Sequence, residues 1–225
     1  MKEVLEQLHE TIEESASPAR LMAVSKNHPY EAIEEAYELG ERLFGENRVQ
    51  EIESKFPAKK DRPSDLELHL IGHLQSNKVK KAVPLVDSID SVDSLKLLRA
   101  INKKSAEIGC IMNILLEYNT SGDANKTGFS SYESIKETVI ESKELSNVRI
   151  NGLMTIGPLG GSEEEVREAF LSLKDMRNKL EKDCDIELKE LSMGMSGDYQ
   201  IALECESTMI RVGTKIFGAR DYSKK

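Results

Sequence analysis

The sequence lacks an excess of positive charge, a cysteine framework and a long hydrophobic run. It has 31 Lys and Arg against 40 Asp and Glu, and the net charge of −9 opposes broad binding to nucleic acids or anionic membranes. Its three cysteines are an odd number without metal-ligand spacing, so reduced thiols are expected. No apolar run approaches the roughly 20 residues of a membrane span, and the glutamate-rich N-terminus does not resemble a signal peptide. These absences predict a soluble, cytoplasmic protein with no nucleic-acid or membrane partner.

The order of apolar and charged segments predicts parallel strands joined by helices. Short runs of Val, Ile, Leu and Met alternate with longer charged segments of helical period. Eight strands are predicted, at residues 21–25, 42–44, 66–71, 88–89, 112–118, 150–154, 190–193 and 209–212. A helix is expected after each of the first seven strands, as at 30–39, 94–108 and 163–182, and an extra amphipathic helix precedes the first strand. The helix over 163–182 has Ser162 as its expected N-cap.

Length and motifs decide between two architectures for these eight strands. A doubly wound sheet would carry a nucleotide fingerprint, yet neither G-x-G-x-x-G after the first strand nor G-x-x-x-x-G-K-[ST] occurs. The 225 residues are a typical length for one α/β barrel. We therefore predict an α/β fold, a single (β/α)8 TIM barrel that forms one domain over residues 1–225.

A barrel places its active site where the strands end, so the residues that follow each predicted strand are candidates. Lys26 directly follows the first strand. Apolar walls around it would lower its pKa and favour the neutral amine that attacks carbonyl groups. The alternative is an ordinary surface lysine at the start of a loop.

Polar side chains also follow the second and third predicted strands. Asn47 comes after the tight turn that Gly45 permits, and it could serve the site or cap the next helix. His69 and His73 are four residues apart without a third ligand nearby, so no metal is expected. Instead, we expect one of these histidines to pack on a flat cofactor ring.

Two later segments predict a site for a phosphate group. Ser196 and Gly197 follow the seventh strand, where a hydroxyl and exposed N–H groups at the start of a helix bind anions; helix capping is the alternative. Arg211 lies within the eighth strand, and Gly213 and Thr214 follow it. Because the loops after strands 7 and 8 of many barrels bind phosphate together, the two segments support each other.

Three aspartates, Asp87, Asp90 and Asp93, are spaced three residues apart. This spacing could suggest a metal site. We interpret the series instead as the end of a strand followed by the N-cap of the helix at 94–108.

The motifs at these strand ends together resemble one family, the pyridoxal phosphate homeostasis proteins, also called proline synthetase co-transcribed homologues. The matching segments are AVSK at 23–26, FGEN at 44–47, VQE at 49–51, IGHLQ at 71–75, GLMT at 152–155, LSMGMS at 191–196 and RVGT at 211–214. They follow the family's order over nearly the whole chain, which makes the combination specific. The sequence departs from the family at Arg48, Leu68 and Leu70, where aromatic residues are common, and at Glu206, where Gly is usual.

The resemblance implies a fold related to the N-terminal barrel of alanine racemase, with pyridoxal 5′-phosphate as the cofactor. Lys26 would hold this cofactor as a Schiff base, and Arg211 would face its pyridine nitrogen. The other residues implied near the cofactor are Asn47 and His73 beside the ring, and Ser196, Gly197, Gly213 and Thr214 at the phosphate.

The same residues bear on whether the cofactor serves catalysis. An arginine beside the pyridine nitrogen disfavours protonation there and weakens the electron sink that carbanion chemistry needs. Racemisation also needs a second acid or base, which alanine racemase takes from an additional domain of a partner subunit. The sequence ends soon after the last predicted strand, so we expect that domain to be missing and the protein to be monomeric.

We therefore expect a carrier or regulator without turnover, which buffers pyridoxal phosphate or delivers it to apo-enzymes that depend on it. One alternative is a pyridoxal-phosphate-dependent amino acid racemase or decarboxylase of low activity. The other is a metabolic barrel that binds a phosphorylated substrate without the cofactor, which would leave Lys26 unexplained.

Overall fold

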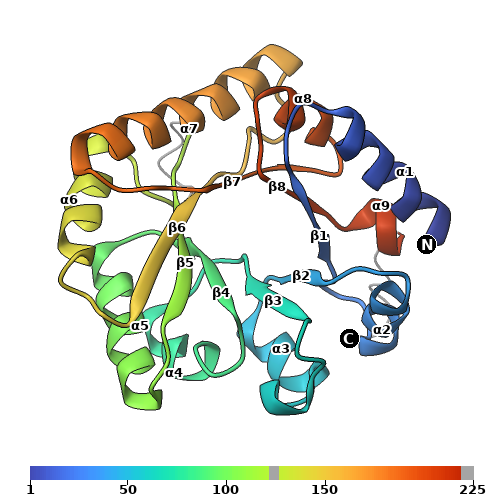
Figure 1. The fold of residues 1–225 in the computed structure, drawn as a ribbon, viewed down its shortest axis with the longest axis horizontal. Helices are drawn as coiled ribbons and strands as arrows, with labels where there is room; N and C mark the ends of the chain where they lie inside the picture. The colour runs from blue at the N-terminus through green and yellow to red at the C-terminus, as the bar shows by residue number, and fades with distance from the viewer. Residues whose placement is uncertain (122–126, 219–225) are drawn as a thin grey trace.

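Residues 1–121 and 127–218, which the computed structural model describes, form a closed ring of eight parallel strands surrounded by helices (Figure 1). Each strand pairs with its neighbours in chain order, and β8 closes the ring on β1. The strands are β1 Arg20–Val24, β2 Leu43–Glu46, β3 Glu67–Leu70, β4 Ser88–Val92, β5 Met112–Glu117, β6 Val148–Met154, β7 Glu190–Met195 and β8 Met209–Val212. The helices are α1 Lys2–Glu14, α2 Tyr30–Glu38, α3 Val49–Lys55, α4 Val79–Ala82, α5 Leu95–Ile108, α6 Tyr132–Ser142, α7 Glu163–Cys184, α8 Tyr199–Glu204 and α9 Thr214–Phe217, with short 3₁₀ turns at Lys59–Asp61 and Ser76–Lys78.

This topology confirms the predicted (β/α)8 barrel and the extra helix ahead of the first strand. The expected cap of α7 is also present: the Ser162 hydroxyl accepts a hydrogen bond from the Glu165 N–H, and the Glu165 carboxylate accepts one from the Ser162 N–H. Three strands extend beyond their predicted ends. β2 continues to Glu46, β4 to Val92 and β7 to Met195.

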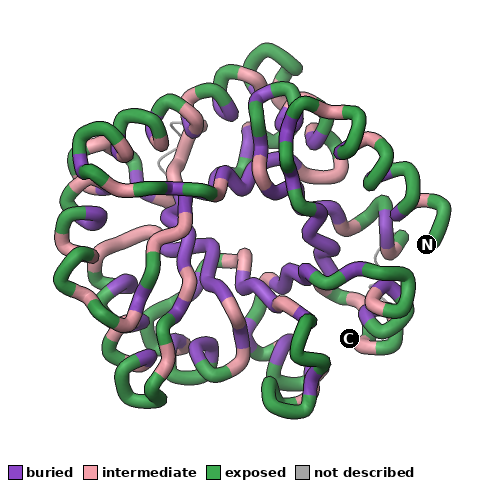
Figure 2. Tube along the Cα trace, viewed as in Figure 1, coloured by how far each residue is buried: buried purple, intermediate pink, exposed green. Residues whose placement is uncertain are grey.

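Most of the apolar core lies between the strands and the helices rather than inside the ring. Alternate strand residues point outward and pack under the helices, as Leu68 and Leu70 of β3 do. Inside the ring, a small second cluster joins Met22, Val24, Leu43 and Met209. Figure 2 shows the buried residues along the strands and on the helix faces turned toward them. This small cluster fills only part of the barrel interior, and polar side chains such as His69 and Asp90 are also buried.

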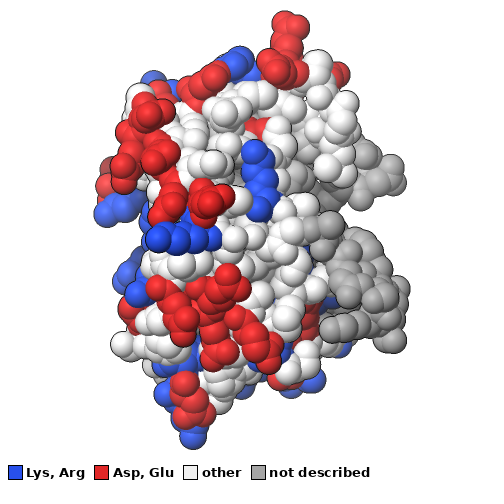
Figure 3. Space-filling model, turned by 90° about the vertical axis from the view of Figure 1, so that its right-hand side faces the viewer, with Lys and Arg blue, Asp and Glu red and all other residues white. Residues whose placement is uncertain are grey.

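The outer surface is rich in carboxylates. α1 and α2 carry exposed glutamates along their outer faces, and red groups are prominent on the side of the molecule shown in Figure 3. Such a face repels polyanions. None of the helices within residues 1–121 and 127–218 combines the length and apolarity that crossing a bilayer requires.

The turn that enters β8 holds a strained residue. Glu206 has φ +64°, in the left-handed region that favours glycine, and its carboxylate pairs with Lys174 at 2.7 Å on the surface. We expect Glu206→Gly to be about 1 kcal/mol more stable than Glu206→Ala, because both variants lose the ion pair and only glycine relieves the strain. Urea unfolding of the two variants measures this difference. Equal stability would show that φ at this position carries no strain.

Candidate functional site

A cavity of about 190 Å³ opens at the end of the barrel where β1, β7 and β8 terminate. Apolar side chains of the strand ends form part of its wall, and amine, guanidinium and hydroxyl groups form the rest. The lining residues are Val24, Lys26, His28, Ile71, Met195, Ser196, Gly197, Arg211, Gly213 and Thr214. Among these described residues there is no carboxylate. The cavity therefore combines an apolar wall with cationic and hydrogen-bonding groups, which suits a flat anionic ligand.

Six of the eight predicted site residues come together in this cavity, namely Lys26, Ser196, Gly197, Arg211, Gly213 and Thr214. Lys26 lies two residues after Val24, the last residue of β1, and is partly buried. The segments after β7 and β8 lie side by side, and the Gly213 N–H donates to the Ser196 hydroxyl at 3.4 Å. The expected convergence of these two segments is thus present in the structure.

Glycine is needed where the segment after β8 passes β1. A Cβ atom on Gly213 would lie 2.8 Å from the Val24 carbonyl oxygen, whereas a Cβ on Gly197 would meet open space. The close approach at Gly213 brings Thr214 next to the end of β1. As for the capping alternative, the N-cap of α8 is Asp198 rather than Ser196. The Asp198 carboxylate accepts from the Met195 N–H at 2.5 Å instead of bonding within the helix.

Arg211 is a buried cation at the bottom of the cavity. It is 5% exposed, and its guanidinium donates to the Ser192 hydroxyl and to the Thr155 carbonyl oxygen, each at 2.7 Å. Burial lowers the pKa of Arg211, while the carboxylates of Asp90, Asp198 and Glu117 act to raise it. Two fixed hydrogen bonds and surrounding negative charge hold this guanidinium in one orientation.

The other two predicted residues do not line the cavity. Asn47 follows β2, and its backbone packs closely on Gly72. A Cβ atom on Gly72 would lie 2.2 Å from the Asn47 carbonyl oxygen. It does not cap α3, whose N-cap is Arg48 without a side-chain bond. The ring of His73 is half-exposed and lies 3.1 Å from the Asp93 carboxylate. Roles for Asn47 and His73 beside a ligand stay predictions.

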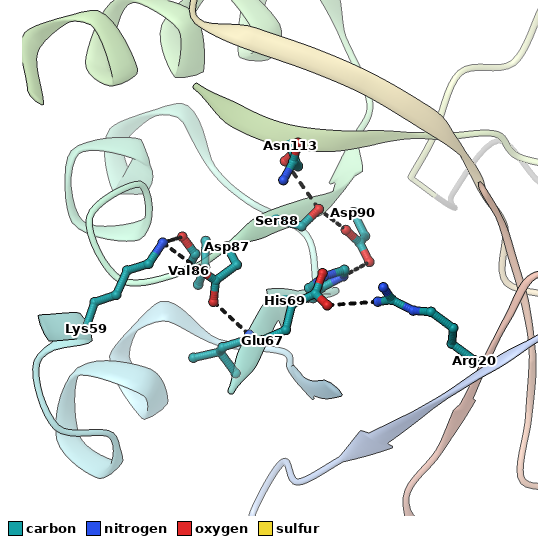
Figure 4. Close-up of polar contacts among 10 residues, drawn as sticks. Arg20, Lys59, Glu67, His69, Val86, Asp87, Ser88, Asp90 and Asn113 are labelled. Atoms are coloured by element: carbon teal, nitrogen blue, oxygen red, sulfur yellow. Dashed lines mark hydrogen bonds and ion pairs between the residues drawn. The ribbon is translucent and has the colours of Figure 1, made fainter. Parts of the chain in front are cut away.

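His69 lies inside the barrel on β3, two residues before the cavity-lining Ile71 (Figure 4). Its Nδ1 is 2.8 Å from the Asp90 carboxylate, and its Nε2 is 2.8 Å from the Glu67 carboxylate. Burial alone would lower the pKa of His69, but these two carboxylates outweigh burial and raise the pKa to about 9. Asp90, interpreted from the sequence as part of a strand end, is an interior residue of β4, and the helix cap is Ser94.

Sequence reasoning did not single out His28 or the apolar wall of the cavity. His28 lies two residues after Lys26, and its ring is 5.3 Å from that of Phe217. Val24 and Ile71 could have been found from strand alternation, because they share the inward face with Met22 and His69. His28 had no comparable signal, because its place depends on how the loop after β1 turns.

Comparisons with known proteins bear on this geometry. A family model described as the alanine racemase, N-terminal domain matches residues 3–221. A protein of Aquifex aeolicus (strain VF5) named "Pyridoxal phosphate homeostasis protein" is 39% identical over 225 residues, covering 99% of this chain and 97% of that protein.

Two solved structures of PipY from Synechococcus elongatus PCC7942 have the same fold. The structure without PLP has a TM-score of 0.89 and 40% identity, and covers 96% of this chain and 99% of that chain. The structure with PLP bound has a TM-score of 0.86 and 38% identity, and covers 96% of this chain and 100% of that chain.

Proposed function

Because the chain belongs to the family of pyridoxal phosphate homeostasis proteins, built on the barrel of the alanine racemase N-terminal domain, we propose that it binds pyridoxal 5′-phosphate and acts in the homeostasis of this cofactor. The observation that carries the proposal is the cavity that Lys26 and Arg211 line together with the segments after β7 and β8. The PipY structure with PLP bound supports the same ligand. The whole chain, residues 1–225, would act as one cofactor-binding domain.

The lining groups fit the parts of this cofactor. Ser196, Gly197, Gly213 and Thr214 would hold the phosphate, because hydroxyl and backbone N–H groups are good anion donors. Arg211 would face the pyridine nitrogen. When bound, the cofactor supplies an aldehyde that condenses reversibly with a lysine amine, with loss of one water, and Lys26 is the amine that lines the cavity. Asn47 and His73 would lie at the rim.

We further propose that the protein stores the cofactor and passes it on without turnover. The fixed cation of Arg211 disfavours a proton on the pyridine nitrogen, so a bound ring is a weak electron sink. A Schiff base can be exchanged to an incoming amine without a further catalytic group. The acceptors of the cofactor would be apo-enzymes that require pyridoxal phosphate, and the carrier would act in the cytoplasm. It would be a monomer, and analytical sedimentation measures this oligomeric state.

Spectroscopy of the purified protein tests cofactor binding. Wild-type protein incubated with pyridoxal phosphate should show the yellow absorption of the imine, and borohydride should fix the cofactor on Lys26 in a peptide map. Lys26→Ala should lose the band completely, whereas Lys80→Ala, at an exposed position on α4, should keep it. A colourless wild type would refute the proposal, and fixation on another lysine would refute the role of Lys26.

The second candidate function is an amino acid racemase or decarboxylase of low activity, favoured by the racemase-type barrel. Exchange of the α-proton of amino acids in D₂O, followed by NMR with the loaded protein, separates the two functions. We expect exchange far slower than about 1 s⁻¹, the low end for ordinary enzymes. Exchange faster than that would establish an enzyme.

A further inference from the structure

Lys26 lies in a tight turn between β1 and α2. The His28 N–H donates to the Ser25 carbonyl oxygen at 3.1 Å, which closes a four-residue turn with Lys26 and Asn27 at its centre. Asn27 has φ +64°, and it occupies the third position, where turns that need a positive φ favour Gly or Asn. The direction of the Lys26 side chain therefore depends on how this turn is held.

A second lysine, Lys55 at the end of α3, reaches under this turn. Its Nζ donates to the carbonyl oxygen of Ser25 at 2.9 Å and to that of His28 at 3.1 Å, the first and last residues of the turn. It also donates to the carboxylate of Glu46. An ammonium has three donors, and these are the three acceptors nearest to it. The Lys55 side chain is only 8% exposed, so it is committed to the turn rather than available to a ligand.

Two carboxylates complete the support. Glu46, at the end of β2, is fully buried and accepts from the Ser25 hydroxyl at 2.6 Å as well as from Lys55. Glu51, one turn before Lys55 on α3, accepts from the Asn27 N–H and lies 3.4 Å from the Lys55 ammonium. The backbone of the turn is thus bound at Ser25, Asn27 and His28 by side chains of α3, and Glu46 of β2 adds a bond to the Ser25 hydroxyl.

Stability alone does not explain this cluster. Burial raises the pKa of Glu46 above its ordinary value, even though Lys55 acts to lower it. Among the described residues, one Glu46 carboxylate oxygen has no hydrogen-bond partner. Replacing a buried ion pair by apolar residues is often neutral or stabilising. Apolar side chains, however, cannot bind two carbonyl oxygens and an N–H of a turn. The bonds of this cluster that apolar residues could not replace are those to the backbone of the Lys26 turn.

We propose that Glu46, Glu51 and Lys55 form a clamp that positions Lys26 for imine formation at the mouth of the barrel. The inference rests on the proposed function, in which Lys26 is the amine that reacts. Glu46, Glu51 and Lys55 do not line the cavity. They hold the backbone on both sides of Lys26, so the lysine begins within reach of the aldehyde instead of searching for it.

Two variants loosen the clamp without leaving an unpaired buried charge. The double variant Lys55→Met/Glu46→Gln removes both partners of the buried pair, and Glu51→Ala removes the bond to Asn27 together with the 3.4 Å contact to Lys55. Matched controls are Glu53→Ala on the same helix and Lys81→Met. Glu53 and Lys81 pair with each other at 3.0 Å on the surface, and neither contacts the turn in the described structure.

The measurement separates binding from imine formation. Pyridoxine 5′-phosphate has the ring and phosphate but an alcohol in place of the aldehyde, so its affinity reports the cavity alone. We expect its Kd to change less than about twofold in the clamp variants, while imine formation with pyridoxal phosphate slows about tenfold or more. The two controls should match the wild type. Unchanged imine formation in both clamp variants, or a parallel loss of both quantities, would overturn the clamp.

Hydrogen exchange distinguishes failure of the clamp from failure of the proposed function. Without any cofactor, the amides of residues 25–28 should exchange faster in the clamp variants than in the controls. If the wild type forms no imine, the proposed function is refuted. If the clamp variants still exchange faster than the controls in that case, the three residues are an anchor of the loop and no more. Unchanged exchange would overturn the clamp itself.

Discussion

Replacing Asp90 with alanine is expected to lower the free energy of unfolding by about 3–5 kcal/mol, the usual cost of removing one member of a buried ion pair. Asp90 is 0% exposed, and its carboxylate accepts from the Ser88 hydroxyl at 2.6 Å and contacts His69 Nδ1 at 2.8 Å (Figure 4). Without it, His69 keeps Glu67 as a partner on one side only. The imidazolium would then be buried with half of its compensating charge.

Asp93→Ala is the matched control for this substitution. Asp93 also pairs with a histidine, His73, but that ring is half-exposed at the rim of the barrel. An exposed pair of this kind contributes at most about 1 kcal/mol. Urea unfolding of the cofactor-free variants gives both values. If Asp90→Ala costs no more than Asp93→Ala, then the buried pair does not compensate His69 as the geometry indicates.

The size of this effect follows from an unusual barrel interior. Branched apolar residues usually fill the interior of such barrels. Here, charges of alternating sign run inward from the end of the barrel where the strands begin, with Arg20 bound to Glu67 at 3.1 Å, Glu67 to His69 at 2.8 Å and His69 to Asp90 at 2.8 Å. Asp90 also acts to raise the pKa of Arg211, so the series ends beside the guanidinium of the cavity. Stability and the electrostatics of the site are linked through Asp90.

This interior explains where sequence reasoning about the fold succeeded and where it stopped. All eight strands were found, because apolar outward faces under helices give a strong signal. The prediction ended β4 at residue 89, since the aspartate series was interpreted as the end of a strand followed by a helix cap. Asp90 and Ser91 instead lie within β4. Asp90 contacts His69 on β3, and the Ser91 hydroxyl donates to the Gly72 carbonyl oxygen just after β3. These partners are distant in the sequence, so the local pattern cannot predict them. β2 was cut short before Glu46 for the same reason.

The site shows a similar division. Lys26 and Arg211, two residues that the sequence predicted for the site, both line the cavity. Each drew attention as a long cationic side chain at the end of, or within, an apolar strand. His73 was placed beside a ligand from the resemblance, but its ring pairs with Asp93 at the rim. Lys55 was not noticed, because a lysine at the end of a charged helix is normally exposed. Its burial follows from the packing of α3 beneath the loop after β1, which is a tertiary property.

Raising the pH from about 6.5 to about 9 is expected to destabilise the cofactor-free protein through His69. Both ring nitrogens face carboxylates, so both must carry a proton to donate, and the ring is an imidazolium. Its pKa is about 9 in the folded protein against 6.5 for an ordinary histidine. The folded state therefore binds the proton more tightly, and this contribution is complete below pH 6.5 and lost as the pH rises through 9. The shift corresponds to about 3 kcal/mol.

Urea unfolding at a series of pH values, with the wild type, His69→Gln and His73→Gln, measures this contribution. All other titratable groups are common to the wild type and His69→Gln, so the difference in stability between these two proteins isolates one proton. His73→Gln should keep the full decline, because its ring is half-exposed and only one of its nitrogens meets a carboxylate in the described structure. His69→Gln should be less stable than the wild type at pH 6, and the two should converge toward pH 9.5. A decline of equal slope in the wild type and His69→Gln would assign the lost proton to another group and would mean that His69 is neutral inside the barrel.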